Sequence, residues 1–262
     1  MEHRVTVDKD GHVLLIGLDY AAKRNAMDLD MYWQLAEALG QLDKDPDLRC
    51  GLLYAKGDHF TTGLDLVKWA PVFAEGKFPD MPEGYFDPFR LDEDKRVSKP
   101  MVMAAQGYCL TWGFEVMLTT DIRIGTTDLK LAQIEVQRGI YPVGGATVRL
   151  QQEVGWGTAM RYLLTGDIMS GPEAYRLGVI QELVEPGQQF ERGLEMAHRV
   201  ATKSAPLGVR AIIKSAHRAR IYGNQAALNM LMPEILPIMT SEDSAEGVQA
   251  FIERREAVFK GK

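Results

Sequence analysis

Short β-branched stretches alternate with helical stretches along most of this 262-residue chain. The predicted strands cover Val5–Val7, Val13–Leu18, Arg49–Ala55, Met101–Ala105, Ile122–Ile124 and Val179–Val184. The predicted helices run from an Asp28 cap to about Leu42, then after Gly113, after Gly145 and over Pro172–Leu177. Repeating strand and helix units of this kind predict an α/β fold.

Helical patterns alone occupy the chain from about Gly187 onward, in four stretches with breaks near Pro206, Tyr222 and Thr240. The Met-rich stretch Asn229–Met239 contains Pro233 and Pro237, so its helix is expected to be kinked or interrupted. Methionine fills irregular apolar contacts, which favours the core or a subunit interface over a cofactor site. The last third is therefore predicted to be a helical subdomain.

Composition and charge exclude several classes of protein. The chain is 46% hydrophobic and its net charge is -6, so it has no general attraction for nucleic acid or anionic lipid. Cys50 and Cys109 form neither a disulfide framework nor a metal-ligand spacing. The longest uncharged run, Pro100–Phe114, has 15 residues, fewer than the ~20 of a membrane span, and no signal peptide is recognised. We expect a soluble, cytoplasmic protein without a metal.

The segment Ala70–Lys99 is expected to lack regular structure. It combines four prolines with five aromatic residues: Pro71, Pro79, Pro82, Pro88, Phe73, Phe78, Tyr85, Phe86 and Phe89. Disordered segments are poor in aromatic residues, so plain disorder is disfavoured. Two interpretations remain: a surface excursion held to the body by its aromatic side chains, or a loop that covers a substrate.

Glu115 is the one charged residue among the 21 residues from Pro100 to Thr120. A carboxylate in such apolar surroundings is expected to be buried, and buried charges need a partner, a shifted pKa or a catalytic role. The alternative is a carboxylate in the first turn of the helix after Gly113, stabilised by the helix dipole. The residues alone leave both interpretations open.

Glu135 and the glycines that follow it give weaker signals. Glu135 lies in an apolar and polar alternation and, taken alone, predicts a surface strand or loop residue. Gly144 and Gly145 open a helix, which suits a close backbone approach or an anion at a helix N-terminus. No dinucleotide, phosphate-loop, zinc-protease or serine-nucleophile motif is present, and the five histidines do not cluster.

Five motifs, in order and separation, resemble the crotonase (enoyl-CoA hydratase/isomerase) superfamily. They are KRNAM at Lys23–Met27, HFTTGLDL at His59–Leu66, GYCLTWGFEVMLTTDIRIG at Gly107–Gly125, LAQIEVQRGIYPVGGATVRL at Leu131–Leu150 and LTGDIMSGPEAYRLGVIQELV at Leu164–Val184. The C-terminal EGVQAFIERREAVFKG is similar to the last helix of that family. The resemblance covers nearly the whole chain.

The resemblance implies a spiral of ββα units followed by a C-terminal α-helical trimerisation region. Residues 1–200 would form the core with the acyl-CoA site, and residues 201–262 the oligomerisation subdomain of a homotrimer or a dimer of trimers. The Met-rich stretch and an apolar face would be buried against neighbouring subunits; that face contains Ala250, Phe251, Val258 and Phe259.

The family device is a pair of backbone N–H groups that stabilise a thioester enolate. By resemblance these are the N–H of Leu64 and the N–H of Trp112, which precedes Gly113. The two hydratase carboxylates fall on Glu115 and Glu135, at the family's own separation of 20 residues. Glu135 would donate the α-carbon proton, and Glu115 would orient and deprotonate the water.

Further residues are implied to contact the substrate, whose CoA is not a separate cofactor. They are Lys23, Arg24, Thr62, Gly63, Asp65 and Val143, with Arg254 and Lys260 reaching across subunits. Each cation has the alternative interpretation of a solvated surface charge. The chain departs from the family at Thr62, at Val143 and at Thr111-Trp112, where small residues or glycines are usual; we expect Trp112 and Val143 to affect substrate preference more than mechanism.

The sequence is thus interpreted as an enoyl-CoA hydratase that adds water to a 2-enoyl-CoA thioester. A Δ3,Δ2-enoyl-CoA isomerase, which typically relies on one carboxylate at the Glu135 position, is an alternative, as is another thioester-enolate reaction such as decarboxylation or hydrolysis. A non-catalytic acyl-CoA binder or an RNA-binding homologue is the alternative from another class. Glu115 favours the hydratase, and the net charge of -6 argues against RNA.

Overall fold

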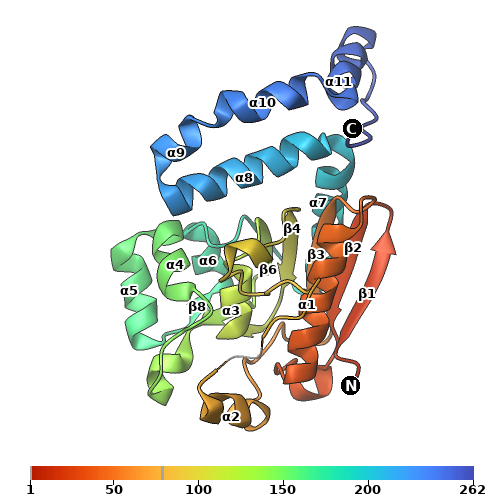
Figure 1. The fold of residues 1–262 in the computed structure, drawn as a ribbon. Coiled ribbons are helices and arrows are strands. Elements are labelled where there is room, and N and C mark those ends of the chain that lie inside the picture. The colour runs from red at the N-terminus through yellow and green to blue at the C-terminus, as the bar shows by residue number, and fades with distance from the viewer. Residues whose placement is uncertain (1, 78–79) are drawn as a thin grey trace.

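A six-stranded sheet forms the centre of the molecule (Figure 1), in a computed structural model that describes residues 2–77 and 80–262. Its strand order is β1 (Val5–Asp10), β2 (Val13–Leu18), β3 (Cys50–Ala55), β4 (Met101–Ala105), β6 (Ile122–Thr126) and β9 (Glu182–Val184). Strands β1 and β2 are antiparallel, and each later pair is parallel. The predicted strands are confirmed, but β9 begins later than Val179 because the Val179 N–H closes the preceding helical turn on Ala174.

A second sheet of three short strands lies beside the first and was not predicted. It contains β5 (Tyr108–Leu110), β7 (Lys130–Ala132) and β8 (Met169–Ser170). Strands of two or three residues are too short for an alternating pattern to be recognised in the sequence. This small sheet positions the candidate site, because β5 leads into the Glu115 helix and β7 leads into the Glu135 turn.

The helices follow the predicted order and include several short additions. They are α1 (Leu29–Lys44), α2 (Leu66–Glu75), α3 (Trp112–Met117), α4 (Ala146–Val154), α5 (Trp156–Thr165), α6 (Gly171–Arg176), α7 (Gln189–Lys203), α8 (Pro206–Tyr222), α9 (Asn224–Leu228), α10 (Leu231–Met239) and α11 (Glu242–Glu253), with 3-10 helices at Ala21–Lys23, Glu93–Lys95 and Ile134–Arg138. Within the described ranges, none of these helices has the length and apolar character needed to cross a bilayer.

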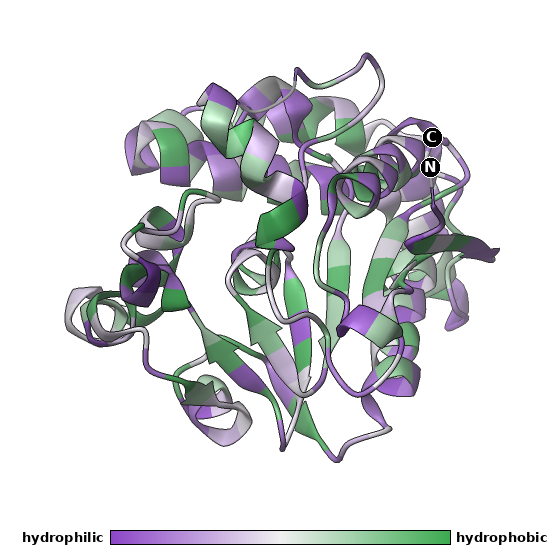
Figure 2. Ribbon diagram, turned by 90° about the horizontal axis from the view of Figure 1, so that it is seen from below, coloured by the Kyte–Doolittle hydropathy of each residue, from purple (hydrophilic) through white to green (hydrophobic). Residues whose placement is uncertain are grey.

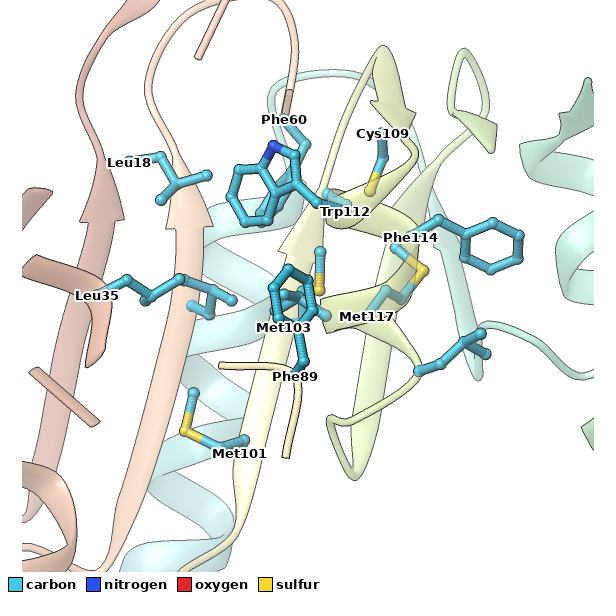
Figure 3. Close-up of a cluster of buried hydrophobic side chains, with 14 of the residues drawn as sticks. Leu18, Leu35, Phe60, Phe89, Met101, Met103, Cys109, Trp112, Phe114 and Met117 are labelled. Carbon is cyan, nitrogen blue, oxygen red and sulfur yellow. The ribbon is translucent and has the colours of Figure 1, made fainter. Parts of the chain in front are cut away.

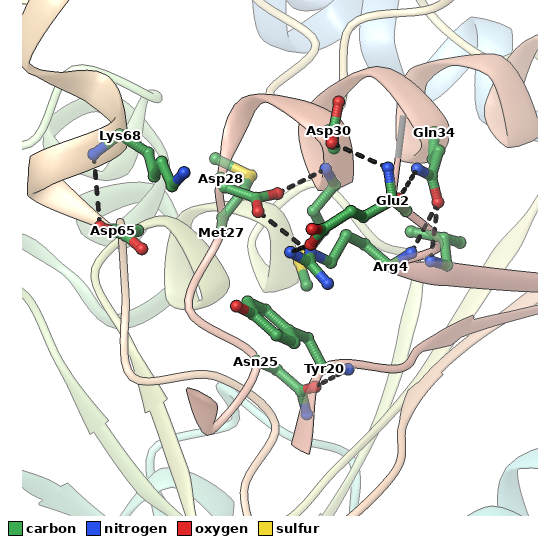
Figure 4. Close-up of polar contacts among 12 residues, drawn as sticks. Glu2, Arg4, Tyr20, Asn25, Met27, Asp28, Asp30, Gln34, Asp65 and Lys68 are labelled. Carbon is green, nitrogen blue, oxygen red and sulfur yellow. Dashed lines mark hydrogen bonds and ion pairs between the residues drawn. The ribbon is translucent and has the colours of Figure 1, made fainter. Parts of the chain in front are cut away.

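Asp28 caps α1 as predicted. Its carboxylate accepts a hydrogen bond from the Met31 N–H at 2.9 Å and a second from the Arg4 guanidinium at 3.0 Å (Figure 4). A side-chain oxygen at this position satisfies one of the free N–H groups of the first helical turn. The helix therefore begins one residue after Asp28, just beyond the first family-like motif, which ends at Met27.

Both faces of the large sheet are covered, as an almost wholly parallel sheet requires. Helix α7 packs on one face through a cluster that includes Leu52, Ala104, Ile124 and Ala197. The other face is covered by a larger cluster that contains Leu18, Leu35, Met103 and Phe114 (Figure 3). Hydrophobic colour accordingly follows much of the sheet in Figure 2, whereas hydrophilic colour is common on the helices around it.

Helices α8 to α11 form a layer beyond the sheet (Figure 1). The predicted breaks are present, and a further break at Asn229-Met230 separates α9 from α10, while Pro237 lies inside α10. Three Met-rich stretch side chains remain exposed, Met230 by 36%, Met232 by 62% and Met239 by 61%. In the isolated chain this stripe is therefore not part of the core.

The prediction that Ala70–Lys99 lacks regular structure is wrong at its start. Helix α2 continues through Pro71 to Glu75 and ends at Gly76, which has a positive φ of 65°. Burial of Trp69 and Val72 against the body of the protein compensates for the hydrogen bond that a proline removes. Phe78 and Pro79 lie outside the described residues, and the 3-10 helix Glu93–Lys95 is the other regular turn of the described segment.

Candidate active site

Glu115 and Glu135 line one cavity of about 910 Å³. Its wall also contains Thr62, Leu64, Thr111, Trp112 and Val143, which were selected from the sequence. Most of the remainder comes from α2 and the two residues after it, from the segment 81–95 and from the turn 139–144. Four further residues complete the wall: Met27, Tyr32, Ile134 and Arg138. Residues from three motifs that are far apart in the sequence therefore meet at one place.

Backbone hydrogen bonds hold these motifs together. The Leu110 N–H donates to the Thr61 carbonyl at 3.1 Å, so the chain before Leu64 runs beside β5. The Thr111 N–H donates to the Ala132 carbonyl at 2.8 Å, which joins the start of α3 to the end of β7. The three segments are thus fixed by main-chain contacts rather than by long side chains.

The two predicted oxyanion donors stand at the ends of these paired segments. Trp112 is the first residue of α3, so its N–H has no acceptor within the helix. Leu64 follows Gly63, whose φ is 108°. Among residues 2–77 and 80–262, neither N–H donates to a protein oxygen. Both are therefore available to a ligand in the cavity.

Thr111, which precedes the second donor, has an unusual backbone conformation. Its φ of 50° and ψ of -116° belong to a region that glycine occupies readily and other residues rarely. A Cβ atom added to Gly63 would lie 2.5 Å from Thr111 Oγ1, so the threonine side chain fills the space beside the glycine. Thr111 and Gly63 therefore pack against each other directly before the two donors.

The Trp112 side chain lies in the core. It is 1% exposed and belongs to the cluster with Phe60 and Cys109 (Figure 3). The core therefore accommodates most of the indole, which is the extra volume that Trp112 has over a small residue. Val143, in contrast, is 55% exposed and lines the cavity.

Glu115 is 4% exposed and lies in the first turn of α3. Burial raises the pKa of its carboxyl group to about 7, although the N–H groups of Ala146 and Gly144 and the charge of Arg149 oppose this rise. The Ala146 N–H donates to Oε1 at 3.1 Å. The sequence pattern suits an anion at the N-terminus of α4, and the Glu115 carboxylate lies at that position. A Cβ on Gly144 would lie 2.6 Å from its Oε2.

Glu135 lies in the 3-10 helix Ile134–Arg138 and is half-buried, rather than being the surface strand or loop residue that its local pattern predicts. Burial raises the pKa of its carboxyl group to about 7; its own backbone N–H lowers this pKa, and the Glu115 charge raises it. The two carboxyl groups are therefore close enough to influence each other's protonation.

Gln133 is a functional candidate that sequence reasoning missed. It is 1% exposed, and with its amide nitrogen turned toward Glu135 it donates to both carboxylate oxygens, at 3.0 and 3.1 Å. The opposite orientation would place the amide oxygen against those two oxygens. Its place two residues before Glu135 in the fourth motif was the available signal.

The predicted CoA contacts divide into two groups. Lys23 and Arg24 are exposed, and the Thr62 N–H donates to the Arg24 carbonyl at 3.1 Å, which puts their turn next to the cavity wall. Asp65 caps α2, because its carboxylate accepts from the Lys68 N–H at 3.3 Å (Figure 4). Arg254 and Lys260 follow α11, on the far side of the molecule from α2 (Figure 1), and do not line the cavity.

The arrangement is suited to proton transfer. Two carboxyl groups that titrate near neutral pH can supply one proton donor and one proton acceptor at the same time. The free N–H groups beside them can stabilise an oxygen that becomes negatively charged. In the part of the chain that the structure describes, no cluster of three His, Cys, Asp or Glu side chains could hold a metal ion.

Comparisons with known proteins agree with this geometry. The sequence profile described as enoyl-CoA hydratase/isomerase matches residues 8–262. A crystal structure of a "probable enoyl-CoA hydratase/isomerase" from Mycobacterium abscessus is 43% identical, with a TM-score of 0.95 over 99% of each chain. Enoyl-CoA hydratase EchA19 of Mycobacterium tuberculosis is 30% identical over 98% of this chain and 96% of its own. Carnitinyl-CoA dehydratase of Salmonella heidelberg is 31% identical over 100% of both chains.

Proposed function

Because the chain belongs to the enoyl-CoA hydratase/isomerase, or crotonase, family, we propose that it is an enoyl-CoA hydratase that adds water across the double bond of a 2-enoyl-CoA thioester. The observation that carries the proposal is the pair of glutamates, the buried Glu115 and the half-buried Glu135, in one cavity beside two backbone N–H groups that have no protein acceptor among the described residues.

In the proposed mechanism the thioester carbonyl oxygen accepts hydrogen bonds from the N–H groups of Leu64 and Trp112. Negative charge builds up on this oxygen when a nucleophile adds to the β-carbon. Donors that are already fixed by the backbone stabilise that charge without having to reorganise, which lowers the barrier.

The two glutamates then divide the proton transfers. Ionised Glu115 accepts a proton from the water, whose oxygen bonds to the β-carbon, and protonated Glu135 donates its proton to the α-carbon. One proton is taken up and one is given, so the product has gained one water molecule. The amide of Gln133 holds the Glu135 carboxyl group in place through both oxygens.

Substrate binding and assembly are part of the same proposal. The turn at Lys23 and Arg24, with Thr62, Gly63, Asp65 and Val143, would surround the thioester and its CoA, while Arg254 and Lys260 would come from a neighbouring subunit. Residues 1–200 would form the catalytic core and residues 201–262 the contacts of a homotrimer or a dimer of trimers, in the cytoplasm. The exposed methionines of α10 support the second part.

The alternatives are related reactions or binding alone. A Δ3,Δ2-enoyl-CoA isomerase would need one carboxyl group near the α-carbon, so it gives Glu115 no role. A dehydratase, the reaction named for the Salmonella relative, runs through the same kind of thioester enolate. The presence of both glutamates in the cavity favours a water-adding or water-removing reaction over an isomerase, a hydrolase or a non-catalytic acyl-CoA or RNA binder.

The deciding experiment follows the absorbance of the conjugated thioester while the protein acts on a panel of 2-enoyl-CoA substrates. Loss of absorbance with formation of a 3-hydroxyacyl-CoA is the expected result. A 3-enoyl-CoA is the comparison substrate. Its absorbance increases if the protein shifts its double bond into conjugation with the thioester. Isomerisation of the 3-enoyl substrate without hydration of any 2-enoyl substrate would replace the hydratase proposal with the isomerase.

A further inference from the structure

Large apolar side chains that line the cavity remain open to solvent. Six of them are at least 44% exposed: Leu66, Phe73, Leu91, Ile140, Tyr141 and Val143. They come from three separate segments, namely α2, the segment 81–95 and the turn 139–144. Exposed apolar side chains that gather around one concave site, instead of being scattered, mark a surface that a ligand covers.

Aromatic rings continue this apolar surface toward the interior. Trp69 is 0% exposed, and its indole N–H donates to the Met27 carbonyl at 2.8 Å, which fixes the ring. Its ring contacts Tyr32 at a centroid distance of 5.6 Å and stacks on Phe73 at 6.2 Å. The aromatic part of the wall therefore runs from the buried pair Tyr32 and Trp69 out to the exposed Phe73.

Two of the charged groups on this side of the cavity, Asp87 and Lys77, have partners within the protein. The Asp87 carboxylate accepts from the N–H groups of Phe89 and Leu91, each at 2.9 Å. Lys77 is paired with Asp80 at 2.9 Å. The two backbone contacts leave the buried Asp87 carboxylate poorly placed to recognise a polar acyl group, because it would first have to break them.

We propose that this site takes acyl groups that are long or bulky and apolar, with more than about six carbons, and that Phe73 and Leu91 determine this preference. This inference rests on the proposed function, because the acyl chain enters as part of the thioester held between Leu64 and Trp112. A four-carbon acyl group would occupy the space near the glutamates and leave the outer apolar side chains in water. The volume of about 910 Å³ is near the upper end for pockets that hold drug-sized ligands.

The test measures the affinity of saturated acyl-CoAs with 4, 8 and 12 carbons by calorimetry, below their micellar concentrations. Affinity is expected to rise several-fold for each added pair of carbons, because each buried methylene contributes at most roughly a fourfold gain. Phe73→Ser and Leu91→Ser should each reduce the ratio of 12-carbon to 4-carbon affinity by about tenfold. Val67→Ser is the matched control, because Val67 is on α2 and 83% exposed but does not line the cavity.

Equal affinities for the 4-carbon and 12-carbon acyl-CoAs would overturn this inference. It would also be overturned if Phe73→Ser and Leu91→Ser kept the wild-type melting temperature and had the same ratio of 12-carbon to 4-carbon affinity as Val67→Ser. Tighter binding of a carboxylate-terminated acyl-CoA than of its apolar counterpart would also overturn it. The readout needs no turnover. A protein that prefers long acyl-CoAs but hydrates none of them would contradict the proposed hydratase and leave the apolar preference intact.

Discussion

At the scale of single residues, Glu115 and Glu135 are the groups whose chemistry can be tested most directly. Glu115→Gln and Glu135→Gln keep the shape of each side chain and remove its ability to transfer a proton. Each should lower kcat for hydration by about 10² to 10⁴, the range for a positioned acid or base. Acyl-CoA affinity should change little, since the backbone donors remain.

The control for these variants is Glu75→Gln. Glu75 is exposed at the end of α2 and does not line the cavity. Full activity of Glu115→Gln combined with loss of activity in Glu135→Gln would contradict the two-carboxylate mechanism. That outcome would leave Glu115 with a structural role at the N-terminus of α4.

The raised pKa of Glu115 also predicts how stability depends on pH. Its ordinary value is 4.5 and its value in the folded protein is about 7. Below pH 4.5 both states hold the proton, whereas between pH 4.5 and 7 the unfolded state releases it and the folded state retains it. The free energy of unfolding should therefore fall as pH rises through this window and then level off.

Glu115→Gln removes this contribution, so its stability relative to wild type should increase from pH 5 to pH 8. Urea unfolding at both pH values measures the difference, with Glu75→Gln as the reference for an exposed glutamate. A constant difference between the Glu115→Gln and wild-type proteins would contradict the raised pKa.

Thr111 gives the third prediction for a single residue. Glycine should relieve the backbone strain at φ 50°, which costs about 1–3 kcal/mol, and raise the melting temperature by a few degrees. Removing the side chain that packs on Gly63 should also loosen the spacing of the two donors and lower kcat by about tenfold, less than the 10²–10³ cost of losing one donor. Thr111→Ser should retain more activity; a stabilised Thr111→Gly variant with full kcat would show that the contact is not needed.

At this scale the sequence predicted part of the site. Glu115 could be identified as a candidate functional residue because it is the one charge in an apolar run. Burial of a charge is costly in any fold, so such a residue needs a partner or a role. Glu135 was recognised through the family resemblance, since its local pattern is that of a surface residue. Gln133 was missed because its role depends on where its amide points, which no single-sequence pattern reports.

At the scale of elements, the start of α4 is the feature most sensitive to a small change. A Cβ on Gly144 would approach both Glu115 Oε2 and Phe89 Cδ1 to 2.6 Å, so Gly144→Ala should displace the carboxylate. A displacement of about 1 Å can cost up to roughly 10²-fold, and we expect kcat to fall by at least tenfold. Gly157→Ala is the matched control: this glycine is in α5 with no atom within 4 Å of an added Cβ, so the change should be tolerated. Equal kcat values for the two variants would contradict the tight fit at Gly144.

The elements that were mispredicted share a physical cause. Helix α2 was missed because Pro71 normally ends a helix, and here the burial of Trp69 overrides that local preference. The strands β5, β7 and β8 were missed because their pairing, not their sequence, defines them. Longer elements such as α1 were predicted because cap and apolar periodicity agree there.

At the scale of the whole molecule, the C-terminal layer predicts an assembly. An apolar groove of about 820 Å³ lies between α8 and α10 and includes Ile212, Leu231 and Ile235. Light scattering at micromolar concentration should give three or six times the chain mass of 29.3 kDa. Leu231→Lys should shift the protein toward monomer, and Val67→Lys, on the exposed side of α2, should not. A wild-type mass of one chain would contradict this assembly.

The position of Arg254 and Lys260, on the far side from α2, has a kinetic consequence if they serve a neighbour's site. Each subunit then carries only part of its own nucleotide-binding site. The fraction of sites that are complete therefore depends on the concentration of subunits. The observed rate should depend on enzyme concentration with an order greater than one when the protein is diluted below its dissociation constant, and addition of an inactive Glu115→Gln subunit should restore the rate of a dilute wild-type sample. The C-terminal tail would in this way let the abundance of the protein, and not the abundance of its substrate alone, decide when the reaction runs.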